Sequence, residues 1–363
     1  NIAITVGSRG IANLDIIVKE VVSVIKEFGG KPFIIPAMGS HGGANSEGQI
    51  GVLAGMNITE ETVGAPIKAT METVIIATAE NGLPVHIDKY ANEADGIVIL
   101  NRIKPHVGFR GDFESVLMKM IAIGFGKQKG ASICHDLGFG RMAENIPALA
   151  KKVIEKKNII FALGIIENAY DETCKVLALS KDEIEIEEPQ MLVEAKKNLP
   201  KICFDKFDVL IIDEIGKDIT GTGLDTNIVG RYHTPYASGG PKITKMIVLD
   251  LTEKSHGNGN GIGIVDFTTK RFFEKLDLEQ TYPNSITSTV QESIKIPMIL
   301  KNDKLAIQTA IKTCNLYDKS DVKIVRIKNT LHLGYIYISE NLIEEAKKDD
   351  RLEILEELQP LAF

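Results

Sequence analysis

Residues 1–43 read NIAITVGSRGIANLDIIVKEVVSVIKEFGGKPFIIPAMGSHGG, and this stretch decides the fold class. Residues 1–6 are an apolar run that predicts a strand, which ends in a loop carrying Ser8 and Arg9. Residues 15–28 have apolar side chains at helical spacing, and two glycines end the predicted helix. Residues 31–37 predict a second strand, which stops at a loop carrying His41. A strand, a helix and a second strand in this order predict a βαβ unit with parallel strands.

The same alternation continues beyond this unit. Residues 96–100 predict a third strand, which runs into a loop carrying His106, and residues 159–166 predict a fourth. Parallel sheets bind ligands beyond the carboxyl ends of their strands. We therefore expect the loops of Arg9, His41 and His106 to lie together at one sheet edge.

A chain of 363 residues favours two domains. The charged stretch 181–201 reads as the connection, so we predict an N-terminal α/β catalytic and cofactor-binding domain at 1–190 and a C-terminal α/β domain at 191–363. The expected fold is two α/β lobes with mostly parallel sheets and an active-site cleft between them. In the second lobe the apolar pattern predicts strands at 207–213, 245–251, 261–266 and 322–327, and a last helix at 342–358.

Composition excludes several classes of protein. The net charge of −7 is spread along the chain, which argues against nucleic acid or an anionic membrane as the partner but allows a small acidic ligand. No apolar run reaches the roughly 18 residues that a membrane span needs. Four cysteines without CxxC spacing indicate neither a zinc knuckle nor an iron–sulfur cluster, and they fit a reducing cytoplasm. The oligomeric state stays open, a homo-oligomer included.

Histidines are the first candidates for catalytic or metal-binding residues. The chain has seven, and three of them, His41, His106 and His135, follow loop signals in the first half. Histidine both binds metals and moves protons near neutral pH. His86, by contrast, lies in an alternating apolar–polar pattern and is predicted to be a structural strand residue.

Residues 101–135, NRIKPHVGFRGDFESVLMKMIAIGFGKQKGASICH, are basic and rich in glycine. This composition suits a phosphate or carboxylate ligand, and a solvated basic helix face is the alternative. Lys119 lies in an apolar stretch, 116–121. Its amine either reaches the surface or is partly buried, and burial would lower its pKa and make it nucleophilic.

Two glycine pairs resemble halves of a dinucleotide fingerprint, at 124–126 and at 221–223. Neither completes G-x-G-x-x-G after a strand with an acidic residue about 20 positions later. An NAD-type hydroxyacid dehydrogenase is therefore the weaker enzyme hypothesis. A two-lobed protein that binds an anion or sugar acid without catalysis is a second alternative.

An ordered set of motifs resembles the nickel-pincer-nucleotide-dependent lactate racemases. Those enzymes have a strand-end loop with an arginine, a Gly-x-His, a Pro-His, and a lysine followed sixteen residues later by a histidine. The matching elements here are Arg9, Gly39-Ser40-His41, Pro105-His106, Lys119 and His135, with the same separation of sixteen. Residues 224–228, LDTNI, resemble a further segment of that family.

The resemblance implies a role for each matched residue. His135 would bind nickel, and Lys119 would hold the pincer nucleotide (pyridinium-3-thioamide-5-thiocarboxylic acid mononucleotide nickel) through a thioamide. His41 and His106 would be acid–base residues, one on each face of the substrate. Arg9, with Ser8 beside it, would hold the cofactor or a substrate carboxylate. Arg231 and His233 would contact substrate, and Arg110, which lies where the chain departs from the family pattern, is a further candidate for substrate binding.

The implied function is a cytoplasmic racemase or epimerase that inverts C2 of a 2-hydroxy acid by hydride transfer. Its partners would be the hydroxy acid and the enzymes that make the cofactor. The chain departs from the family pattern at residues 110–115, RGDFES, and at Val229-Gly230. The polar side chains of Arg110, Asp112 and Glu114 favour a larger polar acid, such as a sugar acid, over lactate.

Overall fold

The computed structural model describes residues 1–361, and the chain divides into two compact units after Leu199. The boundary predicted from the sequence, residue 190, lies inside helix α8 (Ile184–Asn198). The charges of this stretch suggested a linker, but its apolar positions are buried, so it folds as a helix of the first unit. Those buried positions are Ile184, Met191, Leu192 and Ala195.

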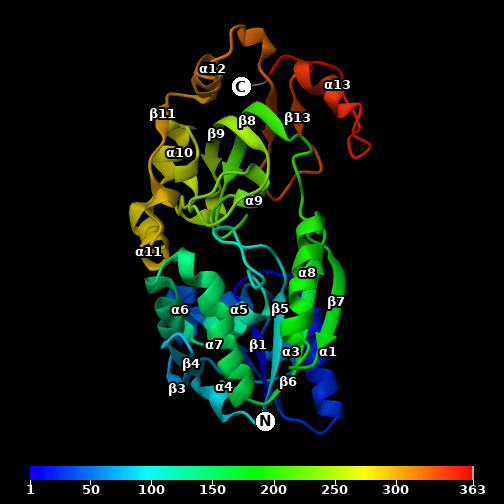
Figure 1. The fold of residues 1–363 in the computed structure, drawn as a ribbon, viewed down its shortest axis with the longest axis vertical. Coiled ribbons are helices and arrows are strands. Elements are labelled where there is room, and N and C mark those ends of the chain that lie inside the picture. Colours follow the sequence, from blue (N-terminus) through cyan, green and yellow to red (C-terminus); the bar gives the residue numbers. More distant parts are fainter. Residues whose placement is uncertain (362–363) are drawn as a thin grey trace. The chain divides into compact units, whose positions relative to one another are not determined.

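The first unit is built on a five-stranded sheet with the strand order β2-β1-β5-β6-β7 (Figure 1). All neighbours are parallel except β6 and β7, which are antiparallel. The strands are β1 (Ile2–Val6), β2 (Pro32–Pro36), β5 (Gly96–Arg102), β6 (Ile159–Glu167) and β7 (Thr173–Leu179). A separate antiparallel hairpin consists of β3 (Thr73–Thr78) and β4 (Pro84–Asp88), so His86 lies in a strand as predicted.

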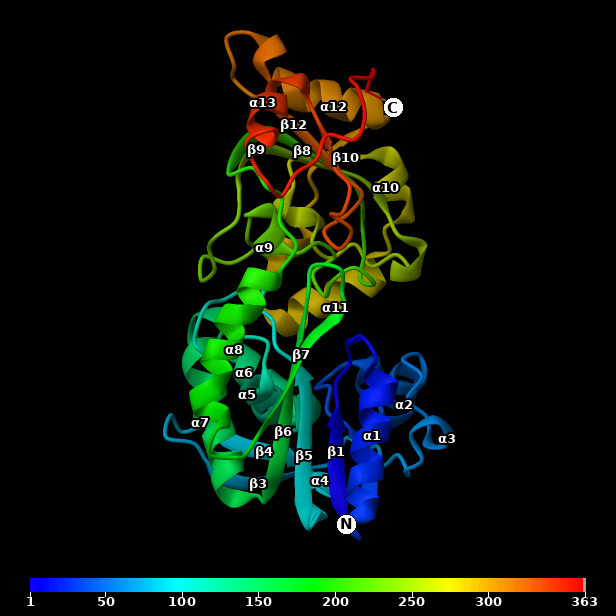
Figure 2. The same ribbon diagram turned by 90° about the vertical axis from the view of Figure 1, so that its right-hand side faces the viewer.

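Helices cover both faces of this sheet (Figure 2). Helix α1 (Leu14–Glu27) buries Val18 and Val22 in one core with Ile4 and Ile34 of the sheet. Helix α8 packs on the other face, where Gly164 of β6 makes room, because a Cβ there would lie 2.6 Å from Met191 Cε. The remaining helices are α2 (Ser46–Ala54), α3 (Glu60–Val63), α4 (Lys89–Glu93), α5 (Leu117–Lys119), α6 (Lys127–Asp136) and α7 (Met142–Lys156).

The second unit has a six-stranded sheet with the strand order β11-β10-β9-β8-β12-β13. Only β12 and β13 are antiparallel. The strands are β8 (Lys206–Ile215), β9 (Lys242–Leu251), β10 (Phe267–Thr269), β11 (Met298–Leu300), β12 (Ile324–Ile327) and β13 (Tyr337–Ile338). The helices are α9 (Thr226–Val229), α10 (Lys270–Lys275), α11 (Leu278–Ser288), α12 (Asp303–Lys312) and α13 (Ile343–Ala346).

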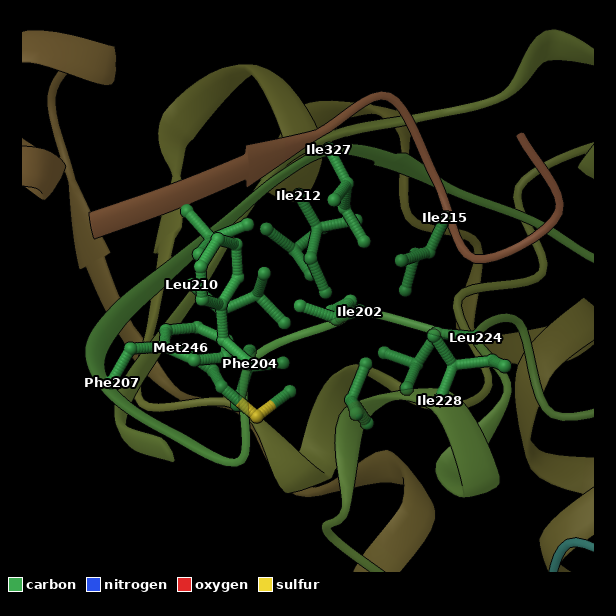
Figure 3. Close-up of a cluster of buried hydrophobic side chains, with 14 of the residues drawn as sticks. Ile202, Phe204, Phe207, Leu210, Ile212, Ile215, Leu224, Ile228, Met246 and Ile327 are labelled. Carbon is green, nitrogen blue, oxygen red and sulfur yellow. The ribbon is translucent and has the colours of Figure 1, made fainter. Parts of the chain in front are cut away.

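An apolar core lies on one face of this second sheet. Leu210 and Ile212 of β8 and Met246 of β9 pack with Leu224 and Ile228 from the segment around α9 (Figure 3). Alternation along β8 sends Val209 and Ile211 to a second cluster, which contains residues of α12. The sheet is therefore covered on both sides, as expected of parallel strands.

Two predicted elements of this unit are wrong. The predicted strand 261–266 is a short 3₁₀ turn, Ile262–Ile264, followed by β10. Gly263 lies so close to another segment that a Cβ there would be 2.0 Å from the Glu292 carbonyl oxygen, so these glycines serve close backbone approach. The predicted helix 342–358 ends at Ala346, and Asp349 Oδ1 then accepts from the Arg351 N–H at 3.0 Å, which competes with helix hydrogen bonds.

The predicted class, α/β with mostly parallel sheets, is confirmed. Among residues 1–361, no helix combines the length and the apolar character that crossing a membrane requires.

Candidate functional site

The site begins at the carboxyl edge of the first sheet. Strands β2, β1 and β5 are parallel neighbours, so the loops that follow them leave from the same edge. These loops carry His41, Arg9 and His106. The chain passes from β1 to β2 on one side and later returns to β5 on the other, which makes this edge a topological switch point, where open α/β sheets bind ligands.

The loop of His41 is tight and rich in glycine. Gly39 and Gly42 have positive φ values of 58° and 65°, a conformation that favours glycine. The His41 Nδ1 lies 2.6 Å from the Met38 carbonyl oxygen, which can only accept, so Nδ1 carries the proton. In the neutral ring Nε2 is then the basic nitrogen, and His41 can take a proton there.

The loop of His106 is held by a buried carboxylate. Glu114 is fully buried, and it accepts from the His106 backbone N–H at 2.7 Å and pairs with Lys196 of α8 at 2.7 Å. Arg110 Nη1 donates to the His106 carbonyl oxygen at 2.7 Å. The buried side chain of Glu114 therefore holds the His106 loop in place.

The ring of His106 has the opposite proton arrangement to that of His41. The Gly108 backbone N–H donates to His106 Nδ1 at 3.0 Å, so Nδ1 is the unprotonated nitrogen. The neutral ring then presents Nε2–H as a hydrogen-bond donor. In their neutral forms, the ring of His41 can therefore accept a proton at Nε2, and the ring of His106 can donate a hydrogen bond from Nε2.

Phe139 connects His106 with His135. Its ring centroid lies 5.7 Å from that of His106 and 5.6 Å from that of His135. Phe109 packs on the His106 ring at 4.5 Å. The two histidines therefore share one aromatic wall, although 29 positions separate them in the sequence.

Lys119 lies at the end of α5, directly before a π-helix, Met120–Gly124. Such turns are rare and occur frequently at functional sites. Glu188 of α8 is fully buried and accepts from the Met118 backbone N–H at 3.2 and 3.1 Å, which ties the first turn of α5 in place. Burial raises the pKa of Glu188 well above its ordinary value, and the Met118 N–H opposes this shift.

The amine of Lys119 is strongly perturbed. Burial lowers its pKa to about 8, the nearby Arg9 guanidinium adds to this shift, and Cys134 opposes it. The pKa of Arg9 itself is lowered by desolvation and by Arg102. Arg102 forms an ion pair with Glu167 at the end of β6. A cationic group therefore gathers at this sheet edge, which suits an anionic ligand.

His135 lies near the end of α6, and its Nδ1 is buried without a hydrogen-bond partner among residues 1–361. Burial lowers the pKa of His135 to about 4, and the charge of Lys119 contributes. A buried ring nitrogen without a partner is exceptional and calls for an explanation, such as a ligand that occupies it. The same helix contacts the His41 loop, because a Cβ on Gly39 would lie 3.5 Å from Ala131 Cβ.

A labelling experiment tests the amine of Lys119. At pH 8 about half of a group with a pKa of about 8 is neutral, against roughly one part in 300 for an ordinary lysine at 10.5. We expect reductive methylation of Lys119, followed by peptide mass spectrometry, to rise with a midpoint near pH 8. Arg9→Gln should move this midpoint upward, because losing a neighbouring cation favours the ammonium. A midpoint near 10.5 in both proteins would contradict the shift.

The second unit carries the other two predicted residues. Arg231 donates to Asp266 Oδ2 at 2.7 Å and to the carbonyl oxygens of Ile264, Ile243 and Thr244. This guanidinium joins the loop before β10 to β9, and its contact with substrate stays a prediction. His233 is buried, and burial lowers its pKa to about 4, with Glu292 opposing. Its contact with substrate stays a prediction.

The segment LDTN at 224–227 has a local structural role. Asp225 is the N-cap of α9, and its Oδ1 accepts from the backbone N–H and the side-chain amide of Asn227, both at 2.9 Å. Gly230 ends this helix with a φ of 66°. This capped turn therefore sets the direction of the chain after Gly230.

The first unit thus brings together Arg9, His41, His106, Lys119 and His135, and the role of Ser8 next to Arg9 stays a prediction.

Sequence reasoning missed Gln49, Asp88 and Lys127, which are buried below the His41 loop. The basic stretch 101–135 suggested a solvated face as the alternative for Lys127. The positive φ of Lys127 cannot be recognised from a single sequence. Among residues 1–361, no group of three or more His, Cys, Asp or Glu side chains could hold a metal ion.

Comparisons with known proteins agree with the geometry. Residues 2–135 match the family model described as the lactate racemase N-terminal domain. The fold resembles the structure of the lactate racemase apoprotein from Thermoanaerobacterium thermosaccharolyticum, with a TM-score of 0.57 and 14% identity over 91% of this chain and 85% of that chain. At this identity the likeness concerns the fold alone. No curated protein matches the sequence.

Proposed function

Since the chain is lactate racemase-like in its N-terminal domain, we propose that it is a racemase or epimerase that inverts C2 of a 2-hydroxy acid with a nickel-pincer nucleotide. The observation that carries this proposal is the pairing of a desolvated amine, Lys119, with a neighbouring histidine, His135, whose buried Nδ1 has no hydrogen-bond partner in the described part of the chain.

The residues fit the cofactor. A lysine with a lowered pKa is a nucleophile near neutral pH, as covalent attachment through a thioamide requires. A pincer ligand brings metal donors of its own, so one protein histidine is a sufficient further ligand, and His135 offers a buried nitrogen for it. The cationic group of Arg9 and Arg102 suits the phosphate of a nucleotide or the carboxylate of a substrate. When bound, the cofactor would supply a hydride acceptor, which no side chain is.

The chemistry explains why two histidines are needed. Removing the C2 hydrogen as a proton would place a second negative charge beside the carboxylate, whereas its loss as a hydride leaves a neutral ketone. The hydroxyl proton must leave at the same time, and a base assists by about 10²–10⁴-fold. His41 suits this role, because its Nδ1–H bond to Met38 leaves Nε2 basic. The Nε2–H of His106 suits a donor to the substrate oxygen in the other pose.

The substrate class is the finer part of the proposal. We infer an acid larger and more polar than lactate, because Asp112 is exposed and Arg110 is only partly buried in the loop that follows His106. A panel of 2-hydroxy and sugar acids, incubated with protein co-expressed with the cofactor-making enzymes, tests this by NMR or chiral chromatography. C2 epimers from a sugar acid support the proposal. Binding without inversion of any acid would favour a non-catalytic binding protein.

Replacing His106 tests the acid–base assignment. We expect His106→Gln to lower turnover by about 10²–10⁴-fold, because a glutamine amide can donate a hydrogen bond but cannot exchange a proton with the hydroxyl oxygen in that pose. Nickel content and the mass of the nucleotide adduct should be unchanged. His86→Gln is the matched control, since His86 lies in the β3–β4 hairpin and bonds to Thr73 Oγ1 at 2.9 Å. Full activity of His106→Gln would remove this residue from the mechanism.

A further inference from the structure

Lys127 is an unusual residue for the first position of a helix. Its side chain is fully buried, and its backbone φ of 52° lies in the left-handed region, which lysine rarely adopts. Such strained residues persist where the surrounding structure holds them, and they are found frequently at functional sites. Its ammonium faces three acceptors: the Pro36 carbonyl oxygen, Gln49 Oε1 at 3.1 Å and Asp88 Oδ2 at 3.0 Å.

These contacts leave Gln49 one orientation. An ammonium can only donate, so the amide oxygen of Gln49 must face Lys127, and the amide nitrogen must face the other way. There Nε2 donates to the carbonyl oxygens of Gly39 at 3.0 Å and His41 at 3.3 Å. Gln49 is fully buried, so water does not compete for these bonds.

The His41 loop depends on such support. Gly39 and Gly42 in this loop have positive φ values and no side chains that could anchor the loop. The loop packs directly on the first turn of α2. A Cβ on Gly48 would lie 1.9 Å from the Gly42 carbonyl oxygen, so the two backbones touch. The Gln49 amide then fixes the carbonyl of His41 itself, while Met38 fixes its ring.

We propose that Gln49, oriented by the buried Lys127–Asp88 ion pair, is the positioning residue that holds the His41 loop in place, so that the Met38 carbonyl oxygen can fix the tautomer of the His41 ring. Helix α6 begins at Lys127 and carries His135 near its end, so the relay also ties the acid–base loop to the element of the metal ligand. The inference rests on the proposed function for its catalytic meaning, but its structural content can be measured without cofactor.

The first readout is the ring of His41 in the full chain purified without cofactor. ¹⁵N NMR distinguishes the two tautomers, with the His41 signals assigned from a His41→Gln variant. We expect the Nδ1–H form alone in the wild type and a mixture of tautomers in Gln49→Met, which keeps the side-chain length but loses the amide. Gln128→Met is the matched control, because Gln128 is exposed on α6.

The second readout is turnover by the cofactor-loaded protein. Misplacing a catalytic group by about 1 Å costs about 10²-fold, so we expect kcat of Gln49→Met to fall by that factor with KM changed less than about threefold. Gln49→Glu keeps the acceptor toward Lys127 but presents a second acceptor to the loop carbonyls. It should fold, since its bond to Lys127 becomes an ion pair, and still lose the single tautomer and the turnover.

The outcomes separate the two proposals. If His41 keeps one tautomer and kcat is unchanged in both Gln49 variants, the positioning role is wrong. If the tautomer changes but the wild type inverts no acid on the panel, the structural relay holds and the proposed function fails. If Gln49→Met does not fold, Gln49→Glu decides between these results.

Discussion

Replacing His135 by alanine is expected to abolish nickel retention in protein co-expressed with the cofactor-making enzymes. No described residue forms a hydrogen bond with the buried Nδ1 of His135, and its low pKa of about 4 keeps the ring neutral, as a metal ligand must be. Inversion of the substrate should be lost with the metal. Nickel per chain, measured by inductively coupled plasma mass spectrometry, gives the result directly.

The adduct on Lys119 serves as an internal control in the same sample. Because the proposed tether is a bond to lysine, the nucleotide mass should remain in His135→Ala when nickel is gone. His332→Ala is the matched control, since His332 lies in the second unit and bonds to Asn329 Oδ1 at 2.9 Å. Full nickel occupancy in His135→Ala would sink the ligand assignment. Absence of an adduct in both proteins would mean non-covalent binding or another cofactor.

Replacing Lys127 by methionine should destabilise the first unit more than any surface change. Breaking a buried ion pair by removing one partner costs about 3–5 kcal/mol, because the remaining charge is buried without compensation. Asp88 is 1% exposed, and burial raises its pKa while Lys127 opposes that shift. Denaturant unfolding followed by circular dichroism measures the free energy of unfolding.

The dependence on pH identifies the cause of this loss. In Lys127→Met the folded state should bind a proton at Asp88 more tightly than the unfolded state, so stability falls as pH rises above the ordinary aspartate pKa of 3.8. The difference in the free energy of unfolding between Lys127→Met and the wild type should therefore become smaller as the pH falls toward 3.8. Lys127→Met combined with Asp88→Asn should recover part of the loss at neutral pH, since the amide keeps the N-cap of α4. An unchanged unfolding midpoint in the single variant would show that the pair does not stabilise the fold.

Periodic patterns made the fold predictable from sequence. The apolar runs at 1–6 and 31–37, with the helical spacing between them, correspond to β1, β2 and α1 within a residue or two. Loops that end parallel strands must meet at one edge, so the convergence of Arg9, His41 and His106 followed from the same reasoning. The apolar pattern predicted the wrong element in two places. At Gly263 a close approach of two backbone segments replaces the predicted strand, and at Asp349 a side-chain hydrogen bond competes with the predicted helix.

The sequence by itself determined the α/β class and the sheet edge, because periodicity is a property of the chain, and the resemblance to the lactate racemases supplied the ordered set His41, His106, Lys119 and His135 as a prediction. Only the tertiary structure decided how those side chains are tuned. Burial sets the pKa of Lys119, and nearby backbone groups fix the tautomers of the two histidines. Side chains more distant in sequence hold the loops, as Glu114 and Gln49 do. Desolvation and hydrogen bonding depend on what surrounds a group in space, which a single sequence does not encode locally.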